Sequence, residues 1–241
     1  MRRHSADELI KVNKLSKGFS GLPVISDLTF TVEKGDSLYI VGENGSGKTT
    51  LMKILLGLEK QSSGEVTFAK DNSKIGYLPQ ISDIQSDFPA TVKEVVMSGF
   101  LNRKAFSPFY SAKQKRKAEQ MMAKLELGGL KNHSFKNLSG GQKQRTLLCR
   151  ALCAADGVLL LDEPLNGLDP LAIAQFYEII EKLCEDGMTL IMISHDVSCA
   201  VHHANKILHL GKDDYFFGTA EEYKHSPQGK KMLTEGHHHD L

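Results

Sequence analysis

The sequence predicts an α/β fold, and three observations support that prediction. Ser37–Val41 is an apolar run that leads into a glycine-rich loop, and Lys48–Leu58 then carries apolar residues at helical spacing. After Asp162, helix and strand patterns alternate as far as Leu210. Before Ser37 the chain alternates in the manner of β-strands. Alternation of strands and helices around a buried sheet is α/β architecture.

The predicted elements follow in order along the chain. Two strands separated by a Gly- and Pro-containing segment come first, and the strand–loop–helix unit follows them. Residues from about 88 to 130 are rich in helix formers and predict a helical insert, which a Gly-Gly pair ends. A helix then starts near Ser139. The first two predicted strands are Leu9–Leu15 and Val24–Val32. The other predicted strands are Glu65–Phe68, Lys74–Leu78, Val158–Leu161, Thr189–Ile193 and Lys206–Leu210, and the other helices are Leu171–Cys184 and Val197–Ala204.

Length and charge limit the classes of function. The 241 residues fit one large domain, or one domain with a subdomain, and 30 basic against 29 acidic residues give a formal net charge of +1. A charge so near zero provides no global field for nucleic acid, so no nucleic-acid partner is expected. The basic run Lys113–Lys117 is expected to form a solvated helix face, with a local contact site as the alternative.

Hydropathy and cysteine usage indicate the compartment. No apolar stretch approaches the roughly 18–20 residues of a membrane-spanning helix, and the first residues contain no signal-peptide core. The 4 cysteines include no C-x-x-C pair. Cys149 and Cys153 lie four apart on a predicted helix, but buried, reduced thiols are expected there rather than a zinc site. A cytoplasmic protein is therefore expected.

A complete phosphate-binding loop, G-x-x-x-x-G-K-T, occupies residues 42–49. Its glycines let successive backbone N–H groups point at an anion, which the positive end of the following helix also attracts. Lys48 is expected to reach the β- and γ-phosphates of a nucleotide, and the Thr49 hydroxyl to bind Mg²⁺. The residues expected to bind nucleotide in this region are Gly42, Asn44, Gly45, Ser46, Gly47, Lys48, Thr49 and Thr50.

Two carboxylates, Asp162 and Glu163, end the apolar strand at residues 158–161. A carboxylate at the C-terminal end of a strand in an open α/β sheet faces the ligand crevice. Asp162 is expected to hold Mg²⁺, directly or through water. Glu163 is placed to polarise a water for in-line attack on the γ-phosphorus, either as a base or by orienting the water.

Between these two patterns lies Leu138–Gln142, which reads Leu-Ser-Gly-Gly-Gln. With the phosphate loop before it and the carboxylates after it, the chain resembles the ATP-binding cassette (ABC) ATPases over essentially its whole length. The resemblance implies a P-loop NTPase with an ABC-type α/β core, which contains a mixed β-sheet and an antiparallel N-terminal β-subdomain, plus a helical subdomain. It also implies ATP and Mg²⁺ as cofactors and hydrolysis of ATP as the activity.

The resemblance gives roles to four more residues. Phe19 matches the aromatic that stacks on adenine, usually Tyr in the family, although core packing is an alternative for a Phe near a strand end. Gln80, after Gly-Tyr-Leu-Pro, matches the Q-loop glutamine that senses Mg²⁺ and links the core to the helical insert. Asp169 matches the D-loop and also fits a helix N-cap ahead of a proline. His195 matches the switch histidine near the γ-phosphate. The predicted catalytic residues are thus Glu163, His195 and Gln80, and the predicted Mg²⁺ ligands are Thr49, Gln80 and Asp162.

The signature itself predicts a second phosphate-binding helix terminus. Ser139 can cap its helix, and Gly140 and Gly141 let backbone amides approach an anion closely. Both termini can hardly bind the same phosphate within one chain if the helical insert separates them. The resemblance implies a head-to-tail homodimer in the ATP-bound state, in which Ser139, Gly140, Gly141, Gln142 and the D-loop Asp169 face ATP held by the other subunit.

The expected organisation is a single domain, residues 1–241. Its core comprises residues 1–87 and 139–225, and a helical subdomain at about 88–138 carries the signature at its end. Residues 226–241 are expected to be a polar tail, in which His237–His239 offer weak binding of a divalent ion as the alternative.

Residues 75–80 and 88–99 resemble the zinc/manganese and iron-chelate importer branch of the family. This implies an ATPase subunit at the cytoplasmic face of the membrane, which powers uptake of zinc or manganese through an integral-membrane permease by ATP-driven dimer closure. An extracytoplasmic solute-binding protein would be an indirect partner. An importer ATPase for an iron chelate or another small solute, a soluble ABC ATPase with a non-membrane partner, and a nucleotide-binding module with little hydrolysis remain alternatives.

Overall fold

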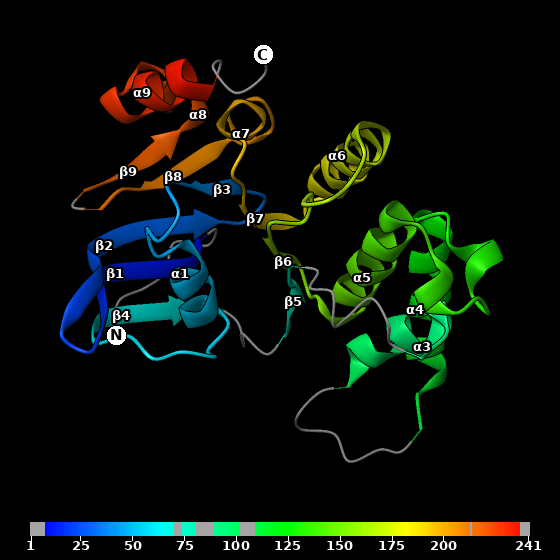
Figure 1. The fold of residues 1–241 in the computed structure, drawn as a ribbon. Helices are drawn as coiled ribbons and strands as arrows, with labels where there is room; N and C mark the ends of the chain where they lie inside the picture. The colour runs from blue at the N-terminus through cyan, green and yellow to red at the C-terminus, as the bar shows by residue number, and fades with distance from the viewer. Residues whose placement is uncertain (1–7, 70–73, 81–88, 102–108, 213, 237–241) are drawn as a thin grey trace. The chain divides into compact units, whose positions relative to one another are not determined.

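The computed structural model describes residues 8–69, 74–80, 89–101, 109–212 and 214–236 (Figure 1). Contacts divide the chain into two compact units. Unit 1 combines Met1–Asn72 with Gly187–Leu241, and unit 2 is Ser73–Asp186. Within the described ranges, no helix is long and apolar enough to cross a membrane.

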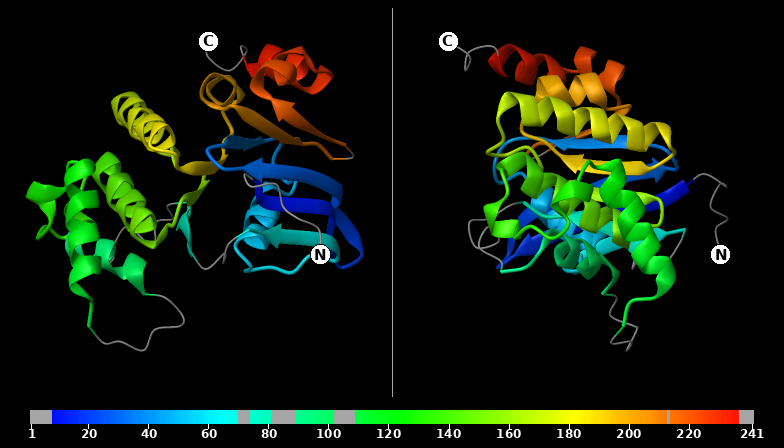
Figure 2. Two further views of the ribbon diagram at one scale, coloured as in Figure 1. Left: turned by 180° about the vertical axis from the view of Figure 1, so that it is seen from behind. Right: turned by 90° about the vertical axis from the view of Figure 1, so that its right-hand side faces the viewer.

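An antiparallel sheet of unit 1 is built by β1 (Glu8–Phe19), β2 (Leu22–Glu33) and β4 (Ser63–Phe68) in the order β2-β1-β4, and Figure 2 shows it from two sides. Both strands of the β1–β2 hairpin are longer than predicted. The turn at Ser20 and Gly21 has φ values of 51° and 83°, which match the twist of the strands, so pairing continues to Phe19 and Leu22. Pro23 is tolerated because β2 is an edge strand.

The second group of strands in unit 1 places β3 (Ser37–Val41) between β7 (Thr189–Ile193) and β8 (Lys206–Leu210), all parallel. Every residue of β3 and β7 is buried, as expected for parallel strands covered on both faces. β9 (Tyr215–Thr219) pairs antiparallel with β8, which makes this group mixed. The antiparallel N-terminal sheet and the mixed strands confirm the predicted α/β class, although β9 itself was not predicted.

Four helices of unit 1 are α1 (Lys48–Leu55), α7 (Val197–His203), α8 (Ala220–His225) and α9 (Pro227–Gly236). α1 is shorter than the predicted helix because Gly57, at φ 69°, ends it. α8 was not predicted, and α9 lies within residues 226–241, for which the sequence predicts a polar tail. His237–His239 lie outside the described residues.

Unit 2 contains the parallel pair β5 (Ile75–Leu78) and β6 (Val158–Asp162). Its α-helices are α3 (Val92–Met97), α4 (Ala112–Lys124), α5 (Gly140–Ala154) and α6 (Pro170–Glu185), and short 3₁₀ segments lie at Ser98–Phe100, Gly128–Leu130 and Phe135–Asn137. α5 packs against β5, α3, α4 and α6. A Cβ added at Gly76 would lie 2.4 Å from the Ala151 carbonyl oxygen, so β5 and α5 approach as closely as their backbones allow.

The C-terminal end of α5 tests two predictions made from the sequence, one for the cysteines and one for the basic run at residues 113–117. Cys149 and Cys153 are buried and free, as expected, and a hydrogen bond between the two thiols, with burial, raises the pKa of Cys149. Lys117 does not belong to the solvated face predicted for residues 113–117. Its Nζ donates to the carbonyls of Cys153 and Ala155 at 3.1 and 3.0 Å, where it caps the last turn of α5.

Candidate active site

The phosphate loop of unit 1 joins β3 to α1, in the strand–loop–helix context that the motif requires. Gly42, Gly45 and Gly47 have φ values of 141°, 81° and 94°, which only glycine adopts without strain. A Cβ at Gly42 would lie 2.2 Å from the Leu210 carbonyl oxygen, so the loop rests directly on the end of β8. Gly47, the N-cap of α1, has no side chain to bond the first amides of that helix.

Lys48 and Ser46 are buried polar residues of this loop, each 5% exposed. Lys48 Nζ donates to the carbonyl oxygens of Gly42 and Glu43, at 2.8 Å each, so the ammonium lies across the loop. Among the described residues, the buried Ser46 Oγ has no hydrogen-bond partner. An uncapped helix start, a buried ammonium and an unpartnered hydroxyl in one glycine loop fit the phosphates of a nucleotide.

The remaining loop residues differ in exposure. Asn44 and Thr49 are exposed, and Thr50 is half-buried. Thr49 lies in the first turn of α1, next to Lys48.

His195 lies at the same edge of unit 1 as the phosphate loop. β3 and β7 are parallel with Ile40 opposite Ile193, so the residues after each strand emerge side by side. The Ser194 N–H donates to the Ile40 carbonyl oxygen at 3.1 Å, which extends this pairing to the residue before His195. The His195 side chain is exposed.

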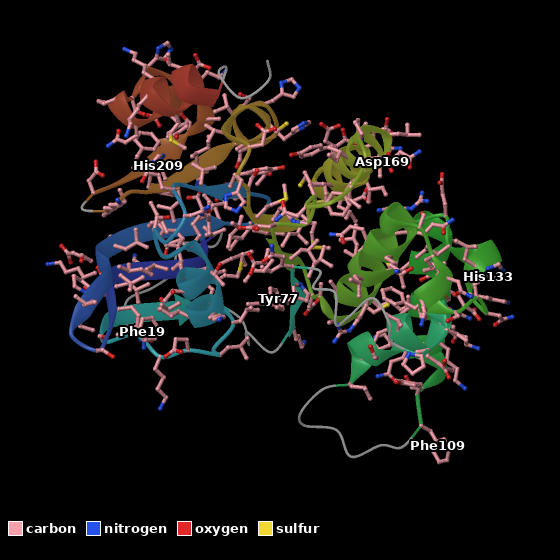
Figure 3. The ribbon with its side chains drawn as sticks, in the orientation of Figure 1. Phe19, Tyr77, Phe109, His133, Asp169 and His209 are labelled. Atoms are coloured by element: carbon pink, nitrogen blue, oxygen red, sulfur yellow. The ribbon has the colours of Figure 1, made fainter. Side chains whose placement is uncertain are left out.

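Phe19, labelled in Figure 3, ends β1 and is 46% exposed, which excludes the core-packing alternative. Lys17 Nζ lies 4.6 Å from the centroid of its ring, a cation–π distance. The exposed ring is available for stacking, as an adenine-binding aromatic must be.

Gln80, Asp162 and Glu163 meet at one edge of unit 2. Leu78 of β5 is opposite Leu161 of β6 in a parallel pair, so the residues that follow the two strands emerge together. Gln80 Nε2 donates to Glu163 Oε2 at 3.1 Å. The structure thus brings a predicted metal-sensing amide into direct contact with the predicted base.

Tyr77 of β5 is a site residue that the sequence did not single out (Figure 3). Its hydroxyl donates to Asp162 Oδ2 at 3.4 Å, and Asp162 is 5% exposed. Burial, and then the charge of Asp162 and this hydrogen bond, raise the pKa of Tyr77 to about 12. The phenol therefore stays protonated at neutral pH and can donate to the carboxylate.

The signature residues form the start of α5. Ser139 Oγ accepts from the Gln142 N–H, and the Gln142 side chain accepts from the Ser139 N–H, which is a complete capping box. A Cβ at Gly140 would lie 3.5 Å from Leu168, and one at Gly141 3.1 Å from Ala172 of α6. The start of α5 therefore lies against Leu168, next to Asp169, and against the start of α6.

Asp169 is the N-cap of α6, with Pro170 following it, as the sequence predicts (Figure 3). Its Oδ1 accepts from the Ala172 N–H at 2.9 Å.

Gln144, two residues beyond the signature, is a further contact that the sequence did not indicate. It is 1% exposed, and its Nε2 donates to the Pro164 carbonyl oxygen, directly after Glu163. Gln144 Oε1 has no partner among the described residues. One buried side chain thus connects the signature helix to the turn that carries the predicted base.

Comparison with known proteins identifies the family. Residues 25–166 match the sequence profile of the ABC transporter family. The chain belongs to this family. The zinc uptake system ATP-binding protein ZurA of Listeria innocua is 34% identical over 228 residues, which cover 91% of this chain and 89% of ZurA. The manganese transport system ATP-binding protein MntB of Bacillus subtilis is 31% identical over an alignment of 250 residues, gaps included, which covers 95% of this chain and 98% of MntB.

A solved ABC transporter in an inward-facing conformation, described as of metal-chelate type, has the same fold as this chain. Its TM-score is 0.83 and its identity 28%, over 95% of this chain and 89% of that chain. These similarities confirm the ABC-type fold predicted from the signature, and with it ATP as the nucleotide and ATP hydrolysis as the activity of this ABC ATPase. Among the described residues, no cluster of three or more His, Cys, Asp or Glu side chains forms a metal site.

Proposed function

We propose that this ABC ATPase powers the import of a divalent metal ion, zinc or manganese, through a membrane permease. The observation that carries the proposal is an ABC nucleotide-binding loop of fitting geometry in a chain similar over nine-tenths of its length to zinc and manganese transport ATPases. The metal ion is cargo, and the residues described below act on ATP.

We propose that unit 1 holds the phosphates. Lys48 would exchange its contacts with the Gly42 and Glu43 carbonyls for the β- and γ-phosphates, and the Ser46 hydroxyl would gain a partner. Asn44, Gly45, Gly47 and Thr50 complete the loop, and Phe19 stacks on the adenine.

Thr49, Asp162 and Gln80 are the proposed ligands of Mg²⁺, which when bound neutralises charge on the phosphate oxygens. Thr49 and Gln80 are exposed, whereas Asp162 is buried with one oxygen bonded to Tyr77. That bond helps to orient the Asp162 carboxylate.

Glu163 is the proposed base or orienting group for the attacking water, assisted by Gln80 and His195. Its side chain already bonds Gln80, and His195 emerges at the sheet edge that carries the phosphate loop. The signature residues and Asp169 are proposed to bind ATP held by a second copy of the chain, so that ATP closes a head-to-tail dimer.

The permease partner and a peripheral position on the cytoplasmic face of the membrane follow from this proposal, with an extracytoplasmic binding protein as an indirect partner. The relatives named for zinc and manganese transport favour those ions over an iron chelate or another solute, and over a soluble ABC ATPase.

Replacement of Glu163 by Gln tests the proposed chemistry. Glu163→Gln should keep ATP binding, accumulate an ATP-bound dimer in size-exclusion chromatography and lower turnover by about 10²- to 10⁴-fold. Glu178→Gln, an exposed position on α6, is the matched control and should hydrolyse ATP at the wild-type rate. Native turnover by Glu163→Gln would remove the assigned role.

Uptake by cells tests the cargo. A strain that lacks the chain should lose accumulation of radioactive zinc or manganese, and wild-type chain but not Glu163→Gln should restore it. Unchanged accumulation of both ions, with loss of iron-chelate uptake, would favour the alternative importer. Purification with a soluble protein and no permease would favour the non-transport ATPase.

A further inference from the structure

The turn that follows β6 holds Glu163 in an uncommon backbone conformation. Glu163 has φ 48°, in the left-handed region that residues other than glycine rarely adopt. The Asn166 N–H donates to the Glu163 carbonyl oxygen at 3.4 Å and closes the turn. Such backbone strain persists only where surrounding contacts determine it.

Asn166 also contacts the carboxylate of Glu163. Its Nδ2 donates to Glu163 Oε2 at 2.7 Å, and Gln80 Nε2 donates to the same oxygen at 3.1 Å. A carboxylate only accepts, so the nitrogen of each amide must face it, and both amide orientations are determined. Two neutral donors from different segments therefore converge on one oxygen of the proposed base.

The two donors differ in what else they must do. Gln80 lies after β5 and is also the proposed ligand of Mg²⁺. Asn166 belongs to the same turn as Glu163, and its backbone and side chain both bond that residue. If Gln80 were to bind Mg²⁺, Asn166 would remain as the donor that the turn itself supplies.

We propose that Asn166 is a positioning residue for the base, a role that rests on the proposed function of Glu163. By holding Oε2, it limits the Glu163 side chain to one orientation before ATP and water arrive. Asn166 acts through Glu163 and touches neither ATP nor water in this role.

Removal of the amide tests the proposal in the full chain, with Mg·ATP as substrate. Asn166→Ala should lower kcat about tenfold with an unchanged KM for ATP, because a hydrogen bond to a charged group is lost while the one from Gln80 remains. Asn132→Ala is the matched control, since Asn132 is an exposed asparagine of unit 2. It should leave kcat and KM unchanged.

A double-mutant cycle with Glu163→Gln separates the possible results. If Asn166 acts through Glu163, Asn166→Ala should have no further effect on the residual turnover of Glu163→Gln. Wild-type kcat in Asn166→Ala, or additive losses in the double variant, would overturn the proposal. If Glu163→Gln itself hydrolyses normally, the proposed function of Glu163 fails instead.

Discussion

Replacement of Gly42 by Ala should disrupt the phosphate loop much more than the same change at Gly45. Both glycines have positive φ, at 141° and 81°, so alanine is strained at either position by about 1–2 kcal/mol. A Cβ at Gly42 would in addition lie 2.2 Å from the backbone oxygen of Leu210, whereas one at Gly45 meets nothing within 4 Å. Overpacking against a backbone group that cannot turn aside adds about 1–3 kcal/mol.

The expected losses of unfolding free energy are therefore about 2–5 kcal/mol for Gly42→Ala and about 1–2 kcal/mol for Gly45→Ala. Denaturant unfolding should be followed without nucleotide, because a bound phosphate would add a contact at Gly45. In the same preparations Gly42→Ala should also bind ATP more weakly, since the loop must move off β8 to accept the methyl group. Equal destabilisation by the two substitutions would refute the reasoning, because the larger loss expected for Gly42→Ala rests on the steric contact with Leu210.

Three further predictions concern pH and helix capping. The pKa of Tyr77 is raised to about 12, so between pH 10 and 12 this tyrosine ionises in the unfolded chain before it does so in the folded one, and the free energy of unfolding decreases as pH rises. In denaturant titrations over this range, Tyr77→Phe should make that decrease smaller by about 1 kcal/mol, after allowance for solvent screening. Burial lowers the pKa of His209, whose Nδ1 lies 2.8 Å from the Tyr223 hydroxyl, so the stability present above about pH 6.5 should be lost as pH decreases. In unfolding measured from pH 7.5 to 5, His209→Gln should make the free energy of unfolding depend less on pH. Ser139→Ala removes the capping box of α5 and should cost about 1 kcal/mol of stability and also lower ATPase activity. Thr91→Ala removes the equivalent box of α3 and should cost the same stability without changing the activity, whereas equal ATPase losses would show that capping alone explains both effects.

The sequence predicted those parts of the site that depend on residues close to one another along the chain. The phosphate loop needs glycine at positive φ, and its glycines are spaced accordingly. Ser139 and Asp169 each stand directly before a helix, so each could be predicted as an N-cap from its neighbours alone.

The parts that the sequence did not reveal depend on pairing between distant segments. Tyr77 meets Asp162 only because β5 and β6 lie side by side, and Gln144 meets Pro164 only because α5 packs near the end of β6. The hydrophobic periodicity of the sequence does not indicate either of these contacts. β9 was missed for a related reason, because Tyr215–Thr219 is a short half-buried strand with no alternation, whose pairing depends on the turn at Gly211.

The left-handed backbone at Glu163 sets stability and activity against each other at one position. Glycine there would relax the backbone, by roughly 1 kcal/mol, and would also remove the carboxylate. A library randomised at this position and selected for thermal resistance should therefore enrich glycine or asparagine, and the selected proteins should fold well and fail to turn over ATP. Engineering this ATPase for robustness must accordingly leave this turn strained and seek stabilising changes elsewhere.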